Sequence, residues 1–305
     1  MIQSIRDIFE LNTTLLGEID KAVCYFREQQ CDKALEHMAN SIDKVKLSIE
    51  IIISNQEYFH VVNTESMLEM LTGILEAKKN RDYILLADLL ELQLINFLIG
   101  VQELIISKEE IEFDEQNYRC NIEHLLTHSE GLEERLQEPM NTAQLLESGY
   151  RIEFTSCGLM TLAAENEGCK FYFHTNNKVQ TEAFQLARHW YQEDKSGYII
   201  YGYGMGYHIR ELLAMAPDAH FTIYEADANV LQLACAFTDM KKIFSSANMK
   251  LYYDPDFKLL QDKLSKADTS EVLRVHYPSY KNIRNQESRM LLASALPWAD
   301  TIETC

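Results

Sequence analysis

Basic residues are scarce in this sequence. Its 305 residues include 28 Lys and Arg against 47 Asp and Glu, so the formal net charge is −19. The pI is near 4.9. Proteins bind nucleic acids and anionic membranes through basic patches, and this balance argues against both as partners. We therefore expect no nucleic-acid binding.

The sequence also lacks long apolar runs, a signal-peptide pattern and CxxC cysteine pairs. The most apolar stretch, 83–106, is interrupted by Asp88, Glu91 and Glu103, whereas a membrane helix needs about 20 apolar residues. Charges appear too early in the first ten residues for a signal peptide. The seven cysteines include no CxxC pair, which indicates neither a zinc site nor a disulfide framework. These absences predict a cytoplasmic protein with no membrane insertion and no metal site.

Proline is absent before Pro139, and the first 110 residues carry helical patterns. Apolar residues recur at intervals of three and four over 5–26 and again over 35–53, which is typical of amphipathic helices. Asn63 or Thr64 can cap a third helix that ends near Asn80. A fourth helix, from about 82 to 107, is apolar on more than one face. The sequence therefore predicts an antiparallel helical bundle over 1–135.

The residue pattern changes after the segment 136–149, which we expect to be a linker. Short β-prone runs at 150–155, 159–163 and 170–174 are separated by turn residues and predict hairpins. From 179 onward helices and strands alternate, with strands expected at 198–201, 221–224, 249–253 and 271–276. This alternation predicts a Rossmann-like α/β domain over 150–305, with a parallel, doubly wound sheet.

One stretch organises this second half. The strand 198–201 enters a turn that contains Gly202, Gly204 and Gly206, a helix follows, and the next strand ends on Glu225. Glycine permits positive φ, so the chain can turn sharply and expose helix N–H groups to a ligand. A carboxylate at the tip of the second strand can accept hydrogen bonds from ribose hydroxyls. The spacing Gly-x-Gly-x-Gly is nearer to that of S-adenosylmethionine-dependent methyltransferases than to that of dinucleotide-binding enzymes.

Other candidates follow strand ends, where ligands of such sheets bind. His208 can donate to a phosphate or carboxylate from the first turn of the helix, or it can simply pack. Asp227 can assist Glu225 or cap the next helix. Asp254 is placed to contact an adenine amino group. The remaining strand-end candidates are His174 and His276, as acid–base groups. No Ser/His/Asp or Cys/His set can be argued from spacing, so we assign no catalytic residue.

These residues resemble a known family. The run Ile199–Leu213, which reads IIYGYGMGYHIRELL, and the later IYEAD of 223–227 closely resemble bacterial motility accessory factors, the Maf-type glycosyltransferases that decorate flagellin. Phe171–Thr175 and Val275–Ser279 fit the same family. The resemblance covers about 148–285. In that family a second Rossmann-like domain, which opens with Gly-x-Gly-Pro-Ser, is taken to transfer a nonulosonic acid from a cytidine monophosphate donor. No such motif occurs in these 305 residues.

The resemblance implies a nucleotide-binding or partner module of a bacterial protein-glycosylation system, without complete transferase chemistry in this chain. Its partners would be a nucleotide or nucleotide sugar, and another protein or a second copy of the chain held through the helical bundle. Two alternatives remain open at this point. One is an S-adenosylmethionine-dependent methyltransferase that uses the glycine loop, Glu225 and Asp254, and the other is a non-catalytic assembly protein.

Overall fold

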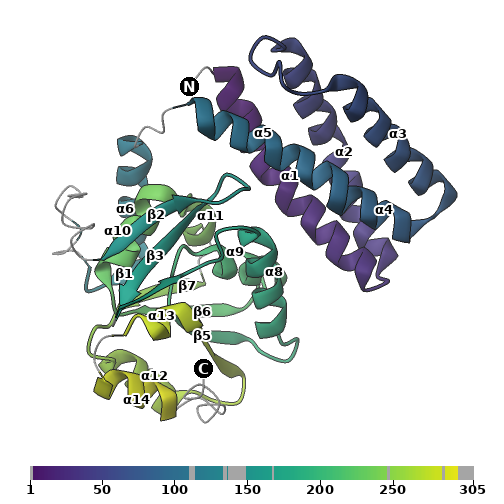
Figure 1. The fold of residues 1–305 in the computed structure, drawn as a ribbon. Helices are drawn as coiled ribbons and strands as arrows, with labels where there is room; N and C mark the ends of the chain where they lie inside the picture. Colours follow the sequence, from purple (N-terminus) through teal and green to yellow (C-terminus); the bar gives the residue numbers. More distant parts are fainter. Residues whose placement is uncertain are drawn as a thin grey trace. The chain divides into compact units, whose positions relative to one another are not determined.

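The computed structural model describes residues 3–109, 114–132, 136, 149–166, 168–245, 248–283 and 286–294. The chain divides into two compact units. The helical unit comprises 1–112 together with two later segments, 154–159 and 176–184. The α/β unit comprises 113–153, 160–175 and 185–305. Figure 1 shows both units along the chain, and each is described by itself.

The helical unit is an antiparallel bundle, as the sequence predicts. Its helices are α1 (Gln3–Arg27), α2 (Cys31–Ser54), α3 (Thr64–Asn80), α4 (Tyr83–Leu89) and α5 (Ile95–Lys108), and a π-helical turn, η1 (Leu90–Leu94), joins the last two. Gln29, at φ 62°, turns the chain from α1 into α2. Asn63 caps α3 by accepting the N–H groups of Glu65 and Ser66, so the predicted cap is confirmed.

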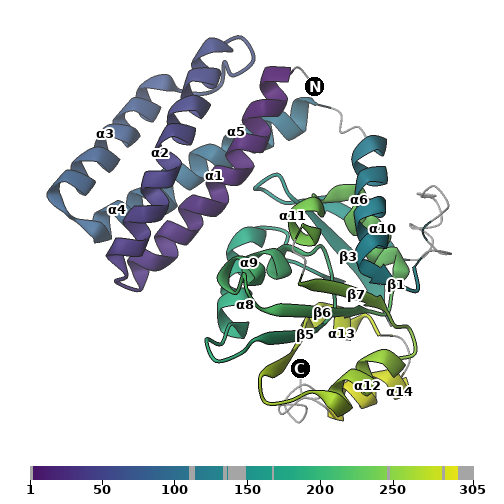
Figure 2. The same cartoon turned by 180° about the vertical axis from the view of Figure 1, so that it is seen from behind.

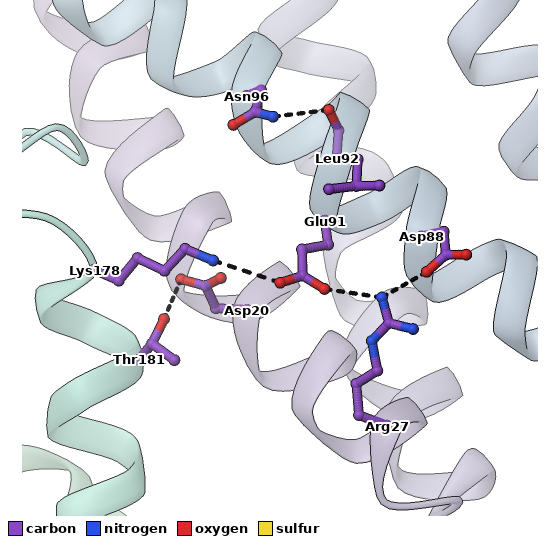
Figure 3. Close-up of polar contacts among 8 residues, drawn as sticks. All are labelled: Asp20, Arg27, Asp88, Glu91, Leu92, Asn96, Lys178 and Thr181. Carbon is purple, nitrogen blue, oxygen red and sulfur yellow. Dashed lines mark hydrogen bonds and ion pairs between the residues drawn. The ribbon is translucent and has the colours of Figure 1, made fainter.

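The fourth helix differs from the prediction of one regular helix, because η1 interrupts it. A π turn shifts the backbone hydrogen bonds by one residue. The side-chain amide of Asn96 donates to the Leu92 carbonyl at 2.8 Å. Glu91, inside η1, accepts from Arg27 at 2.9 Å and lies 3.6 Å from the ammonium of Lys178. Figure 3 shows these contacts, together with the 2.6 Å bond from Arg27 to Asp88.

The stretch Tyr83–Lys108 is long and apolar enough to cross a membrane by length and composition, and 39% of its most apolar window is buried. A core helix of a folded bundle has the same composition. Val101 and Ile105 of this stretch pack in one cluster with Ile5 and Ile8 of α1. These contacts account for only part of the apolar character of the stretch, because Ile84, Leu85 and Leu92 are exposed.

The segment 154–159 completes the core of the helical unit. The buried amide of Gln102 donates to the Phe9 carbonyl and to Thr13 Oγ1, both at 2.9 Å. The Thr13 hydroxyl lies 3.2 Å from the Cys157 carbonyl. Gly158 adopts φ +88°, and a Cβ there would lie 2.7 Å from Gln102 Nε2. The turn at 157–158 is therefore fitted closely against α1 and α5.

The segment 176–184 joins the same unit through polar contacts. Gln180 Nε2 donates to the Thr13 carbonyl at 2.8 Å, and Thr181 Oγ1 donates to Asp20 Oδ2 at 2.7 Å (Figure 3). Burial raises the pKa of Asp20, and the Thr181 hydroxyl opposes that shift. The helical unit thus contains hydrogen bonds between residues more than a hundred positions apart in sequence.

The α/β unit contains two sheets. The larger sheet has the order β1 (Ser129–Glu130), β7 (Met249–Tyr253), β6 (His220–Glu225), β5 (Gly197–Tyr201) and β8 (Glu271–Val275), and each neighbouring pair is parallel. The smaller sheet has the order β2 (Tyr150–Phe154), β3 (Met160–Asn166) and β4 (Cys169–Tyr172), with β3 and β4 antiparallel. Each predicted strand is thereby confirmed to within three residues at either end.

Helices cover both faces of the larger sheet, as Figures 1 and 2 show. Along β5, Tyr198 and Ile200 face one cluster, which includes residues of α6 (Glu115–His128), α8 (Val179–Trp190), α9 (Tyr207–Met215), α10 (Ala228–Phe237) and α11 (Lys241–Phe244). Ile199 and Tyr201 face the other cluster, with α12 (Lys258–Lys266), α13 (Tyr277–Lys281) and α14 (Gln286–Ser294). The Rossmann-like, doubly wound architecture is confirmed.

Helix α6 groups with the α/β unit, whereas the sequence placed residues up to 135 in the bundle. The buried amide of Asn121 donates to the carbonyls of Cys235 and Thr238 at 2.8 and 2.7 Å. Its oxygen accepts from the Met240 N–H at 3.2 Å. Polar side chains of α6 hid this attachment from the hydrophobic pattern. The expected linker, 136–149, lies almost entirely outside the described residues.

Candidate functional site

The glycine turn after β5 has the predicted sharp geometry. Gly202, Gly204 and Gly206 take φ of +96°, +54° and +77°. Residues with side chains rarely adopt this left-handed region, so the turn depends on glycine. The Gly202 N–H donates to the Tyr224 carbonyl at 2.8 Å, which continues the pairing of β5 with β6 into the turn.

Side chains of the protein itself press against this turn. A Cβ on Gly202 would lie 2.4 Å from Ser279 Cβ, and a Cβ on Gly204 would lie 3.0 Å from His174 Nε2 and from His276 Cε1. The glycines thus allow close approach, as expected, but the groups that approach are a serine and two histidines. The role of the three glycines toward a ligand stays a prediction.

Glu225 lies at the tip of β6 and is only 2% exposed. Its Oε2 accepts the Tyr203 N–H at 2.9 Å, and its Oε1 accepts the N–H groups of Ala226 and Asp227 at 2.9 and 3.1 Å. A carboxylate has about four acceptor positions, so about one remains, on Oε2. Burial raises the pKa of Glu225 to about 7, and these N–H donors oppose the rise.

Asp227 caps α10 by accepting the Asn229 N–H at 2.9 Å on Oδ1. Its Oδ2 accepts a short hydrogen bond from the Tyr150 hydroxyl and lies 3.3 Å from Asn282 Nδ2. The Asn282 amide also donates to the Tyr150 oxygen at 2.7 Å. Burial, together with the Asp227 charge, raises the pKa of Tyr150. The capping alternative for Asp227 therefore holds, and sequence reasoning missed Tyr150 and Asn282.

Asp254 directly follows β7 and is 5% exposed. Its Oδ2 accepts the Leu260 N–H at 2.8 Å and so anchors the first turn of α12. Its own N–H donates to the Glu225 carbonyl at 2.9 Å. Asp254 is not among the residues that line the neighbouring cavity, whereas Pro255 is. An adenine-binding role for Asp254 stays a prediction.

A cavity of about 190 Å³ opens at the carboxyl ends of the parallel strands. Side chains from four strand ends meet there, as the topology predicts. Its described lining contains two carboxylates and several polar groups but no basic side chain, and it consists of Tyr201, Glu225, Ala226, Asp227, Pro255, Phe257, Ser279, Asn282 and Ile283. Ligand pockets for drug-sized molecules measure roughly 300–1,000 Å³, so this one suits a smaller group.

Three histidines meet next to the glycine turn. His174 follows β4, His208 lies in the first turn of α9, and His276 follows β8. All three are at most 1% exposed. One ring nitrogen of each lies within 4.8 Å of the others. The rings of His208 and His276 stack at 4.4 Å, and those of His174 and His276 at 4.9 Å.

Hydrogen bonds satisfy few of the ring nitrogens. His276 Nδ1 lies 2.8 Å from Ser279 Oγ, and His174 Nε2 accepts the Met205 N–H at 3.3 Å. Among the described residues, none makes a well-formed hydrogen bond to His174 Nδ1, His276 Nε2 or either nitrogen of His208, although the Gly202 carbonyl lies near His208 and the Phe173 carbonyl near His276. Burial lowers the pKa of His208 to about 3, although the Gly202 carbonyl opposes the shift. Burial and the neighbouring rings also hold the pKa values of His174 and His276 well below the usual range.

All three histidines were candidates from the sequence, but their contact with one another was not predicted. His174 and His276 carried a signal, because both follow strands. His208 lies in a helix six residues after Gly202, and only the tight turn brings that position back to the strand ends. The neutral, packed form anticipated as one option for His208 agrees with its burial and its lowered pKa.

Residues 118–253 match the family described as the glycosyltransferase Maf N-terminal domain. This stretch is therefore similar to the Maf family. The match includes the glycine turn, His208 and Glu225, and it confirms the resemblance drawn from those residues. The Maf stretch thus links the α/β unit to glycosyltransferase proteins at the level of the family. Residues 3–104, in the helical unit, match a domain of unknown function (DUF8042).

Other comparisons add little. No protein with a curated description matches the chain. Among solved structures, the crystal structure of MNMC2 from Aquifex aeolicus is similar over 62% of this chain and 59% of its own length. The identity is 13% and the TM-score is 0.21. This chain therefore spans less than two thirds of that relative, and a likeness so distant carries no argument here.

Proposed function

We propose that this chain is a module of a protein-glycosylation system, and that its α/β unit binds one hydroxyl-bearing ring of a ligand in the Glu225 cavity. The Maf family match supports the glycosylation context. The observation that carries the binding role is the composition of the cavity, which combines the Glu225 and Asp227 carboxylates with the Ser279 and Asn282 side chains.

The acceptor position left on Glu225 Oε2 sets what the cavity recognises. A hydroxyl of a ribose or of another sugar ring can donate to it, and the nearby apolar side chains of Phe257 and Ile283 suit the ring face. An anionic phosphate is disfavoured inside the cavity, because the charged groups of its described lining are carboxylates. The proposal therefore places a sugar ring in the cavity and any phosphate outside it.

Size supports the same conclusion. A cavity of about 190 Å³ lies below the roughly 300–1,000 Å³ of pockets that enclose whole drug-sized ligands. A complete nucleotide sugar would extend beyond it. The chain is thus proposed to act as a binding or partner module, with the transfer step performed elsewhere in the glycosylation system.

Calorimetry on the full chain tests this function with three probes: cytidine, cytidine monophosphate and S-adenosylhomocysteine. We expect cytidine to bind, and the phosphate to add nothing to its affinity. Glu225→Gln should remove binding. Asp256→Asn is the matched control, because Asp256 is an exposed acid next to the rim that does not line the cavity.

The other outcomes separate the alternatives. Micromolar binding of S-adenosylhomocysteine that Glu225→Gln removes would favour a methyltransferase. Much tighter binding of cytidine monophosphate than of cytidine would show that the protein binds the phosphate, contrary to the proposal. If no probe binds to the folded protein, the nucleoside site is refuted and a non-catalytic assembly module becomes the better account.

A further inference from the structure

The three buried histidines of the α/β unit form a cluster that the proposed function does not use. We propose that His174, His208 and His276 bind a transition-metal ion, and that this ion is Zn²⁺. The cluster joins the segment after β4, the first turn of α9 and the segment after β8 beneath the glycine turn. No CxxC pair is present, and His174, His208 and His276 lie far apart in the sequence, so no motif indicated a metal site at these three residues.

Several buried ring nitrogens of this cluster lack a hydrogen-bond partner. His174 Nδ1, His276 Nε2 and both nitrogens of His208 lack one among the described residues. Buried polar atoms are nearly always paired, because leaving one unpaired costs the full desolvation of that group. A metal ion bound through His174 Nε2, His276 Nε2 and one nitrogen of His208 would give two of these four atoms a partner.

Burial of the three rings suits metal binding. A metal binds the neutral imidazole, and each ring is at most 1% exposed, an environment that disfavours the charged form. The contact of His276 Nδ1 with the Ser279 hydroxyl orients this ring and directs Nε2 into the cluster. Metal-binding histidines are commonly oriented by such a contact of their second nitrogen. Ser279 is therefore a positioning residue for the ion.

The donor set favours Zn²⁺. Three imidazoles with one open position form a common tetrahedral zinc site. Zn–N bonds of about 2.0–2.1 Å place the ligand nitrogens about 3.3 Å apart, whereas the ring nitrogens here lie within 4.8 Å of one another. Closure requires the stacked rings of His208 and His276 to rotate out of their parallel arrangement. It also exchanges the long 3.3 Å bond from Met205 N–H to His174 for a metal bond.

The environment sets the fourth ligand. The N-terminal end of α9 carries partial positive charge, which disfavours an uncompensated cation beside His208. A water that ionises to hydroxide, or a small anion, would complete the coordination and reduce the charge. The ion would connect three segments that surround the glycine turn, and its binding should therefore raise the melting temperature of the protein.

The test uses the full chain, freed of metal by dialysis against a chelator. Zn²⁺ is titrated in competition with a chromophoric chelator, and the stoichiometry is measured by elemental analysis. We expect one Zn²⁺ per chain and a higher melting temperature. His208→Gln and His276→Gln should each lower the affinity by more than about 100-fold, beyond the 10–100-fold loss typical of removing an orienting contact. His220→Gln is the control, because His220 is exposed at the start of β6.

A second measurement keeps the proposal testable if the variants do not fold. The wild-type protein loaded with Co²⁺ should show the intense visible absorption of a tetrahedral site. A folded wild-type protein that retains no Zn²⁺, or that binds it equally well as His208→Gln, would overturn the proposal. So would a weak Co²⁺ spectrum typical of six-coordinate, adventitious binding.

Discussion

The backbone N–H of Tyr203, in the middle of the glycine turn, donates to Glu225 Oε2 at 2.9 Å across 22 residues of sequence. This bond ties the turn after β5 to the end of β6. The residue expected to hold a ligand therefore also holds the loop beside it. A change at Glu225 must affect both the turn and the cavity, and experiments on this residue need a readout that separates the two effects.

The raised pKa of Glu225 predicts how stability depends on pH. The folded value is about 7 and the reference value is 4.5, so the folded state holds a proton that the unfolded state has released between these values. Stability is then fully present below about pH 4.5 and is lost as the pH rises through 7. At 1.36 kcal/mol per pH unit, the free energy of unfolding of the wild type should fall by about 3 kcal/mol relative to Glu225→Gln.

Urea unfolding of wild type and Glu225→Gln at several pH values between about 5 and 8 measures this difference. The glutamine can lose hydrogen bonds, but that loss is nearly independent of pH and leaves the slope informative. Parallel curves for the two proteins would show that Glu225 is ionised with an ordinary pKa.

The lowered pKa of His208 predicts that stability falls as the pH is lowered, the opposite of the trend expected from Glu225. Its folded pKa is about 3 against the usual 6.5. The contribution of the neutral ring is fully present above pH 6.5 and is lost as the pH falls toward 3, because the unfolded chain takes up the proton first. His208→Gln should therefore lose less stability than wild type on acidification. Denaturation at about pH 7 and 4.5 measures this, and His220→Gln should follow the wild type.

The glycine turn predicts unequal costs for two substitutions. Gly202→Ala combines positive φ with a Cβ that would lie 2.4 Å from Ser279 Cβ. Gly168→Ala also has positive φ, but no atom lies within 4 Å of its added Cβ. Backbone strain alone costs about 1 kcal/mol or more, and overpacking adds about 1–3 kcal/mol. Equal melting temperatures for the two folded variants would contradict the close fit of the turn.

The hydrogen bonds of Asn121 predict that α6 is firmly attached to the α/β unit. Its amide makes three buried hydrogen bonds, to the carbonyls of Cys235 and Thr238 and from the N–H of Met240. Asn121→Leu leaves these backbone groups without partners and should lower the free energy of unfolding by about 3 kcal/mol. Gln116→Ala, on an exposed position of the same helix, should change it by less than about 0.5 kcal/mol. Similar small effects from both would show that α6 is only loosely attached.

Much of the fold could be predicted, because its signals are local. Hydrophobic periodicity located the helices, and Asn63 indicated the N-terminus of the third helix. The glycine turn with Glu225 indicated the Rossmann-like unit. The π turn at Leu90–Leu94 left no such signal, since its composition is that of an ordinary helix. The attachment of α6 through Asn121 was equally invisible, because a single polar side chain on a helix normally indicates an exposed face.

The candidate site was harder to predict, because it depends on partners distant in sequence. Strand-end position singled out Glu225 and Asp227, and both line the cavity. It could not reveal that backbone N–H groups and the Tyr150 hydroxyl already occupy most of the carboxylate acceptors. Nor could it show the three histidines in contact, since His208 reaches them only through the curvature of the glycine turn.

The helical unit is assembled from three separate stretches of chain, 1–112, 154–159 and 176–184. During synthesis its helices emerge first, while the segments that meet Gln102, Thr13 and Asp20 are still untranslated. The contacts of this core with 154–159 and 176–184 can form only after those residues have been synthesised. A substitution at Gly158 or Thr181 would therefore lower the stability of the N-terminal helical bundle. A recombination point after residue 112 would remove 154–159 and 176–184 from the helical unit.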